Sequence, residues 1–164
     1  MGCVVDIFNF PVLTEVTGLD ISGYTNRQKI EIIEWIILNT MDNIADELPV
    51  RHEIHGGMYA RELFIPAGVV LTGKIHLADH ICLLSQGDLS VMTDDGMRRI
   101  QAPYTFNARA GLKKIGYAHT DCVFTTVHAT DLTEIDDIEA ALLSNGDITW
   151  VDELMQNQGL LEAA

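Results

Sequence analysis

Basic residues are scarce in this sequence, and so are cysteine and proline. Its 164 residues include 10 lysines and arginines against 24 acidic residues, which gives a formal net charge of −14. Proteins that bind the phosphate backbone present Lys and Arg in a patch, so this composition argues against nucleic acid as a partner. The same negative charge repels an anionic membrane surface and favours solubility.

The chain also lacks cysteine pairs and long apolar runs. Its three cysteines, Cys3, Cys82 and Cys122, are an odd number without a close pair, so we expect reduced thiols. No apolar run approaches the roughly 18 residues of a transmembrane helix, and no charged-then-apolar secretory segment opens the chain. These absences predict a soluble, intracellular protein with no membrane partner.

Several catalytic signatures are missing as well. The sequence contains no Gly-x-Ser-x-Gly elbow, no Walker phosphate loop and no His-Glu-x-x-His zinc motif. Acidic residues are plentiful, but most crowd the C-terminal region, where a solvated helix face explains them. The sequence therefore favours a non-enzymatic role, and a metal-dependent enzyme is the alternative.

We expect one compact domain, because 164 residues with 48% hydrophobic content suit a single core. Its predicted parts are an N-terminal helical extension over residues 1–49, a β-rich core over residues 50–130 and an acidic helical extension over residues 131–164. In the core, short apolar or alternating runs are separated by Gly, Pro and Asp, which is typical of a sandwich or barrel. The predicted strands cover residues 63–65, 69–71, 74–84, 89–93, 97–100, 113–117 and 122–130.

Helices are predicted on both sides of the core. After an apolar segment over residues 4–16, Thr25 or Asn26 is placed to cap a helix whose apolar residues recur every three or four positions. These residues are Ile30, Ile33, Ile37, Met41 and Ile44. Two more helices are expected over residues 136–143 and 151–161, with a stop at residues 144–146 between them.

The last predicted helix carries more apolar side chains than a free tail would. They are Trp150, Val151, Leu154, Met155, Leu160 and Leu161. An exposed apolar patch normally marks a partner surface, so the sequence predicts a homodimer or a higher homo-oligomer.

The most informative stretch of the core runs from Gly68 to Gly87. Alternate side chains along a strand share a face, so a strand through Lys74, His76 and His80 would turn all three the same way. This spacing predicts a cleft in which two imidazoles meet an ammonium group.

The same stretch resembles the first motif of the cupin superfamily. That motif reads Gly, five residues, His-x-His, three or four residues, Glu, six residues and Gly, and Gly68, His76 and Gly87 fall on it. Lys74 stands where the first His would be, and His80 stands where the Glu would be. The resemblance implies a mainly β fold, the cupin-type double-stranded β-helix or jelly roll, with added terminal helices.

The second cupin motif is matched less well. Gly111 fits it, but Lys114 occupies the position of the usual His, and Ala118 the position of the usual Asn. Arg109 stands where the motif has Pro. Two of the four usual metal ligands are thus lysines, and a protonated lysine repels a cation instead of binding it.

Two kinds of site are compatible with these residues. If the last strand contributes His128, then His76, His80 and His128 supply three imidazoles, enough for zinc, iron, nickel or manganese. Without a metal, Lys74, Lys114 and Arg109 would instead receive a small anionic ligand such as a carboxylate or phosphate. The sequence does not fix the face of the strand from which His128 points.

Other histidines and glycines have simpler explanations. His52 and His55 form a His-x-x-His spacing that is common by chance, and they are expected to precede the strands. Gly56-Gly57 is interpreted as a turn and not as a phosphate loop. His119 lies in a polar turn and is expected to be solvated.

Residues 59–68, then residues 73–76, His80, and later residues 116–118, Asp121 and residues 126–128, resemble small cupin-like proteins encoded by tailed bacteriophages. The resemblance covers about half of the chain. It implies a viral protein that self-associates, acts in the host cytoplasm or in the virion, and has a structural or assembly role with viral partners. It does not imply one established reaction.

Overall fold

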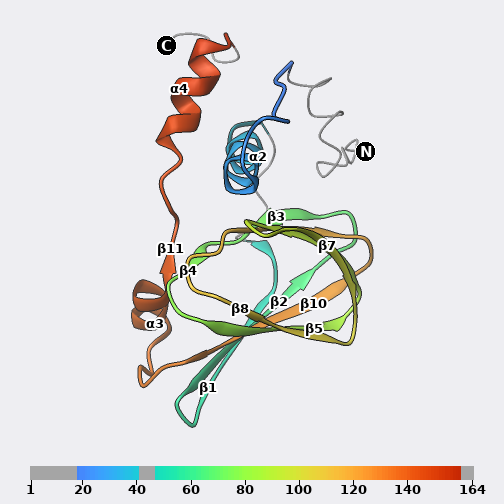
Figure 1. The fold of residues 1–164 in the computed structure, drawn as a ribbon. Coiled ribbons are helices and arrows are strands. Elements are labelled where there is room, and N and C mark those ends of the chain that lie inside the picture. The colour runs from blue at the N-terminus through green and yellow to red at the C-terminus, as the bar shows by residue number, and fades with distance from the viewer. Residues whose placement is uncertain (1–17, 41–46, 160–164) are drawn as a thin grey trace. The chain divides into compact units, whose positions relative to one another are not determined.

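The computed structural model describes residues 18–40 and 47–159, which fall into two compact units (Figure 1). A helical unit holds residues 18–40 and 147–159, and a barrel unit holds residues 47–146. Residues 131–146, which the sequence placed in a C-terminal extension, thus group with the barrel. The predicted segment 4–16 and the predicted roles of Cys3, Met41, Ile44, Leu160 and Leu161 lie outside the described residues.

The helical unit contains helix α2 (Asn26–Thr40) and helix α4 (Thr149–Asn157). Helix α2 begins with a capping box. The Gln28 amide donates to Thr25 Oγ1 at 3.2 Å, and the Thr25 amide donates to Gln28 Oε1 at 3.0 Å. This confirms the predicted start, because each side chain satisfies a backbone N–H that the first turn leaves without a partner.

Helix α4 is held against α2 by the two tryptophans of the chain. Trp35 Nε1 donates to Asp152 Oδ1 at 2.6 Å, and Trp150 Nε1 donates to Glu31 Oε2 at 2.8 Å. Val151 and Met155 are both buried within the described chain. The apolar residues of this helix are therefore partly covered without a second subunit, and self-association stays a prediction.

The barrel unit is built from short antiparallel strands. They are β1 (Val50–His55), β2 (Met58–Ile65), β3 (Val70–Thr72), β4 (Ile75–His76), β5 (His80–Gln86), β6 (Asp88–Thr93), β7 (Gly96–Gln101), β8 (Tyr104–Ala108), β9 (Lys114–Ala118), β10 (Cys122–Ala129) and β11 (Leu143–Ser144). One sheet has the order β1-β2-β10-β5-β8, and the facing sheet has the order β3-β9-β6-β7.

The pairing of these strands defines the fold. Strand β2 pairs with β10, β3 with β9, β5 with β8, and β6 with β7. The chain is therefore one long hairpin, closed at β6–β7, that is wrapped around an interior. This arrangement is the jelly roll, and it confirms the fold predicted from the sequence as a cupin-type double-stranded β-helix.

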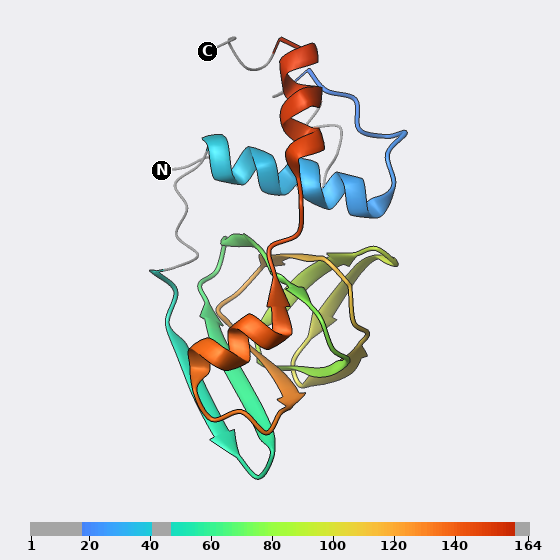
Figure 2. The same cartoon turned by 90° about the vertical axis from the view of Figure 1, so that its left-hand side faces the viewer.

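A short helix and strand lie beside the barrel. Helix α3 (Ile135–Leu142) leads directly into β11, which pairs with β4 through Leu143 opposite His76. Figure 2 shows α3 and β11 along one side of the barrel. No helix in the part of the chain that the structure describes has the length and apolar composition needed to span a bilayer.

Three predictions about the strands are wrong. Residues 74–84 are not one strand, because the chain leaves β4 after His76 and enters β5 at His80. Strand β1 was not predicted. His52 and His55, which were expected to precede the strands, lie within it, and Gly56-Gly57 forms the predicted turn, here the hairpin turn to β2. Strand β8 was also missed. Both strands alternate or mix polar residues without an apolar run, which hides them from a search for apolar segments.

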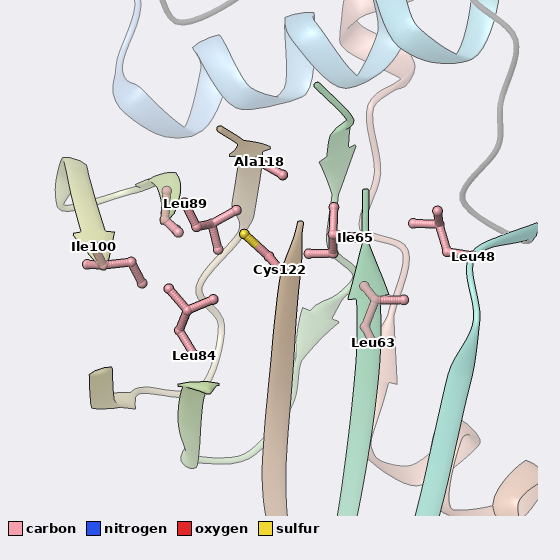
Figure 3. Close-up of a cluster of buried hydrophobic side chains, with 9 residues drawn as sticks. Leu48, Leu63, Ile65, Leu84, Leu89, Ile100, Ala118 and Cys122 are labelled. Atoms are coloured by element: carbon pink, nitrogen blue, oxygen red, sulfur yellow. The ribbon is translucent and has the colours of Figure 1, made fainter. Parts of the chain in front are cut away.

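One end of the barrel interior is filled by an apolar cluster (Figure 3). Its buried members are Leu48, Leu63, Ile65, Leu84, Leu89, Val91, Ile100, Ala118 and Cys122. At this end Gly87 has a φ of +98°, and an added Cβ would lie 2.5 Å from the Asp121 carbonyl oxygen. The glycine of the cupin spacing is thus required by the close approach of two backbone segments.

Candidate functional site

Alternate residues of the same strands change from apolar to polar along the barrel interior. On β5 the buried side chains are Leu84, Cys82 and then His80. Strand β10 follows this order in register, because Thr126 lies opposite Cys82 and Val127 opposite Ile81. The opposite end of the interior from the apolar cluster therefore carries imidazoles.

Three histidines meet at this polar end. The rings of His76 and His80 stack with centroids 4.2 Å apart, and His128 stacks with them at 4.9 Å and 4.6 Å. Their candidate ligand nitrogens all lie within 4.8 Å of one another. The structure thus brings together the three residues predicted as metal ligands, and it turns His128 into the barrel.

The break between β4 and β5 makes this contact available. In one continuous strand, residues four positions apart would be separated by about 13 Å, because the rise is roughly 3.3 Å per residue. Residues 77–79 leave the strand conformation, so the chain bends and His76 stacks on His80. His76 and His80 therefore meet as predicted, but they meet because the chain bends between them and not because they share one face of a single strand.

The hydrogen bonds assign a tautomer to His80. Its Nδ1 lies 3.0 Å from the Ala78 carbonyl oxygen, which can only accept, so Nδ1 carries the proton. In the neutral ring Nε2 is then an acceptor, and Lys114 Nζ donates to it at 2.8 Å. His76 Nδ1 and His128 Nε2 share a second bond of 2.9 Å, and His128 Nδ1 is buried without a partner.

The environment keeps these imidazoles neutral. Burial, followed by the charge of Lys114, lowers the pKa of His76 to about 2. The same two causes lower the pKa of His80 to about 4 and also lower the pKa of His128. At neutral pH the cluster therefore consists of uncharged rings, and the neutral ring is the form that binds metals.

Lys114 projects from β9 into the same region. Its side chain is buried, and burial lowers the pKa of its ammonium group. Besides His80, it donates to Cys82 Sγ at 3.7 Å, and it makes no ion pair with a carboxylate among the described residues. Cys82 and Cys122 are both free thiols, as predicted, and burial raises the pKa of each.

A cavity of about 210 Å³ adjoins the cluster inside the barrel. Lys74, His76 and Lys114 line it, together with apolar residues such as Leu63, Leu89 and Phe124. Arg109 does not join them. It lines a separate depression beside His80 and His128, and its Nη2 pairs with Asp95 at 2.8 Å on the surface. The three cations predicted to hold one anion are thus divided between two places.

Two charged residues of the cavity wall were not predicted. Arg61 comes from β2, where it lies opposite Thr126, and Glu139 comes from α3. Alternation with Leu63 and Ile65 could have placed Arg61 on the inner face, once β2 was extended to its full length. Nothing in the sequence indicates that α3 folds back onto the barrel and brings Glu139 to the cavity.

The remaining histidines lie elsewhere. His52 Nδ1 is 2.8 Å from the Tyr59 hydroxyl, and His55 is exposed three positions further along β1, so the two side chains point to opposite faces. They do not form a joint metal site. His119 is not simply solvated, because its Nε2 lies 2.7 Å from Ser90 Oγ and its ring meets Tyr117 edge-on.

The three-histidine cluster fits a divalent transition metal. Three neutral imidazoles are an established donor set for such ions, and the buried, unpartnered His128 Nδ1 is a polar atom that the protein alone does not satisfy. Binding through His80 Nε2 would replace the bond from Lys114. The nearby Lys114 charge lowers the affinity that the donors would otherwise have.

Solved structures with a similar fold are cupin-type proteins. KdgF from a Halomonas species is 17% identical, with 59% of this chain and 90% of that chain covered and a TM-score of 0.48. A cupin superfamily protein from Desulfitobacterium hafniense is 10% identical, with coverages of 51% and 78% and a TM-score of 0.45. An RmlC-like cupin from Methanocaldococcus jannaschii is 11% identical, with coverages of 51% and 80% and a TM-score of 0.44.

No protein-family model and no curated protein matches the chain. The fold assignment rests on the strand order described above. The chain has the fold of a cupin-type jelly roll, with a histidine cluster at the polar end of its interior.

Proposed function

We propose that this protein binds a divalent transition metal through His76, His80 and His128 and holds a small molecule in the adjoining cavity. The single observation that carries the proposal is the meeting of three neutral, mostly buried imidazoles, with one nitrogen left unpartnered, beside an internal cavity. A few convergent polar groups beside an otherwise mainly apolar pocket are typical of binding sites.

The residues of the chain have separable roles in this proposal. His76, His80 and His128 would hold the ion, and the backbone carbonyl of Ala78 orients the His80 ring through its Nδ1 proton. Lys114 and the apolar wall exclude water from the inner side of the cluster. A bound metal of this kind supplies a Lewis acid that polarises a ligand oxygen. The geometry assigns no general acid or base, so binding is the function proposed.

The test is metal content of the untagged protein, purified without chelator and then titrated with zinc, manganese, nickel and iron(II). The proposal expects about one ion per chain, and loss of stoichiometric loading in His76→Ala. His55→Ala is the matched control, because His55 is an exposed histidine on β1. Full loading of His76→Ala, or absence of loading in the natural sequence, would contradict the proposal.

A phage-related role with assembly partners stays a prediction, supported by the sequence resemblance and by the apolar residues of the terminal helices. Self-association can be tested directly by light scattering of the full chain at micromolar concentration. A dimer or larger species is the expected result, and a monomer would contradict it.

A further inference from the structure

The cavity wall contains charges that the metal site does not use. Arg61 is partly buried, and its guanidinium makes no ion pair with another described residue. The exposed Lys74 and the buried Lys114 line the same cavity, and Glu139 is the one carboxylate among the described residues that line it. A chain with a net charge of −14 thus places three basic side chains against one acidic side chain around a small internal space.

Apart from Thr72, Thr126 and His76, the rest of the wall is mainly apolar, and its polarity changes along the strands. Along β2 the inner face changes from Arg61 to Leu63 and Ile65, and along β9 and β6 it changes from Lys114 to Gly116, which lies opposite Val91. Both sheets therefore present their charged groups at the histidine end and their apolar groups at the far end. A ligand that satisfies both ends has a charged head and an apolar body.

The volume limits the size of that body. Pockets that hold drug-sized molecules measure roughly 300–1,000 Å³, and this cavity measures about 210 Å³. Since one water occupies about 30 Å³ in the liquid, the space accommodates roughly seven to ten non-hydrogen atoms.

From these observations we propose that the cavity binds a short-chain carboxylate, with its carboxylate at Arg61 and Lys74 and its hydrocarbon chain among Leu63, Val91 and Phe124. The planar guanidinium of Arg61 offers two parallel donors that match a carboxylate. This assignment rests on the small-molecule cavity of the proposed function and does not require the metal.

The experiment measures binding of butanoate, hexanoate and octanoate by calorimetry or ligand-observed NMR in protein treated with chelator. Hexylamine and hexanol are probes with the same apolar body and a different head. Hexanoate is expected to bind at least ten-fold more tightly than either. Equal binding of hexanol or hexylamine, or no binding of any carboxylate, would overturn the proposal.

Variants separate the two ends of the cavity. Arg61→Gln should weaken hexanoate binding at least ten-fold, and Arg61→Lys should recover part of the loss. Arg51→Gln is the control, because Arg51 is exposed on β1 and lies near Glu53 and Glu62. Unchanged hexanoate affinity in Arg61→Gln would show that Arg61 is not the anchor and would overturn the assignment.

Gly116→Val tests the apolar end without altering any charge. A Cβ at Gly116 would meet Leu89 Cδ1 at 3.5 Å, an ordinary contact, so the strand can accept the side chain while the cavity loses volume. Hexanoate binding should disappear and thermal stability should be retained.

Metal content of Arg61→Gln is measured in parallel. Normal metal loading with lost carboxylate binding supports the assignment, whereas carboxylate binding that appears only in the metal-loaded protein would overturn it.

Discussion

The two ends of the barrel interior are made by the same strands and differ in the interactions that stabilise them. At the apolar end, Leu63, Ile65 and Leu84 pack into one cluster with no polar atom to satisfy. At the polar end, three histidines and Lys114 depend on a small set of hydrogen bonds, and one buried nitrogen lacks a partner. The comparison teaches that the same strands are apolar at one end and polar at the other, so substitutions at the two ends should have opposite effects on stability.

The largest effect is expected at the apolar end. Leu84→Ala removes a fully buried side chain and leaves a cavity, which should lower the free energy of unfolding by about 2–5 kcal/mol. Urea denaturation measures the change. Leu77→Ala is the control, because Leu77 is 52% exposed and its loss should change the stability by less than about 0.5 kcal/mol. Equal costs for both variants would contradict the proposed core.

The next effect concerns pH and the polar end. The pKa values of His76 and His80 are about 2 and about 4 in the folded protein, lower than the ordinary histidine value of 6.5. The unfolded state therefore binds more protons below pH 6.5, and stability is lost as the pH falls below that value. Between pH 7.5 and pH 5 the loss is roughly 2 kcal/mol for each ring before solvent screening reduces it.

Urea denaturation of metal-free protein at both pH values measures this loss. His76→Gln should remove its share of the pH dependence, whereas His55→Gln, on the exposed face of β1, serves as the comparison. Stability that is the same at pH 7.5 and pH 5 would show that the buried rings are not held neutral.

A smaller and opposite effect is expected for His128→Leu. This substitution removes a buried nitrogen that lacks a partner, and leucine has a similar size. It also removes the bond to His76 Nδ1, so the free energy of unfolding should rise by at most about 1 kcal/mol. Metal loading should be lost in the same variant. A destabilised variant would indicate that the ring makes a structural contribution larger than the cost of its unsatisfied nitrogen.

The smallest effect is expected on metal affinity itself. Lys114→Met removes both the donor that occupies His80 Nε2 and a nearby positive charge. The metal should then bind more tightly, by about three-fold or roughly 0.7 kcal/mol, in a competition titration with a chromogenic chelator. Weaker binding in Lys114→Met would mean that the amine supports the ion.

Part of this comparison could be predicted from the sequence. The spacing from Gly68 to Gly87 indicated the fold and singled out Lys74, His76 and His80, and the second motif singled out Lys114. The direction of His128 was not fixed, because apolar residues lie on both faces of β10, with Phe124 on one face and Val123 and Val127 on the other.

Other parts of the site depend on long-range packing. Arg61 belongs to a strand whose polar half was not predicted, and Glu139 reaches the cavity only because β11 pairs with β4. The separation of Arg109 from Lys114 follows from its pairing with Asp95, which no local pattern indicates. The sequence thus predicted the histidines, Lys74 and Lys114, and it missed Arg61 and Glu139.

The wrapped hairpin has a consequence for the kinetics of folding. Its outer strands pair residues that are distant in sequence, such as Ile65 with Cys122, and the bond between His76 and His128 spans 52 residues. Non-local pairings of this kind form slowly, because the long loop between them must close first. The three imidazoles therefore come together only when the jelly roll closes, and the rate at which refolding protein gains its metal affinity would time that closure.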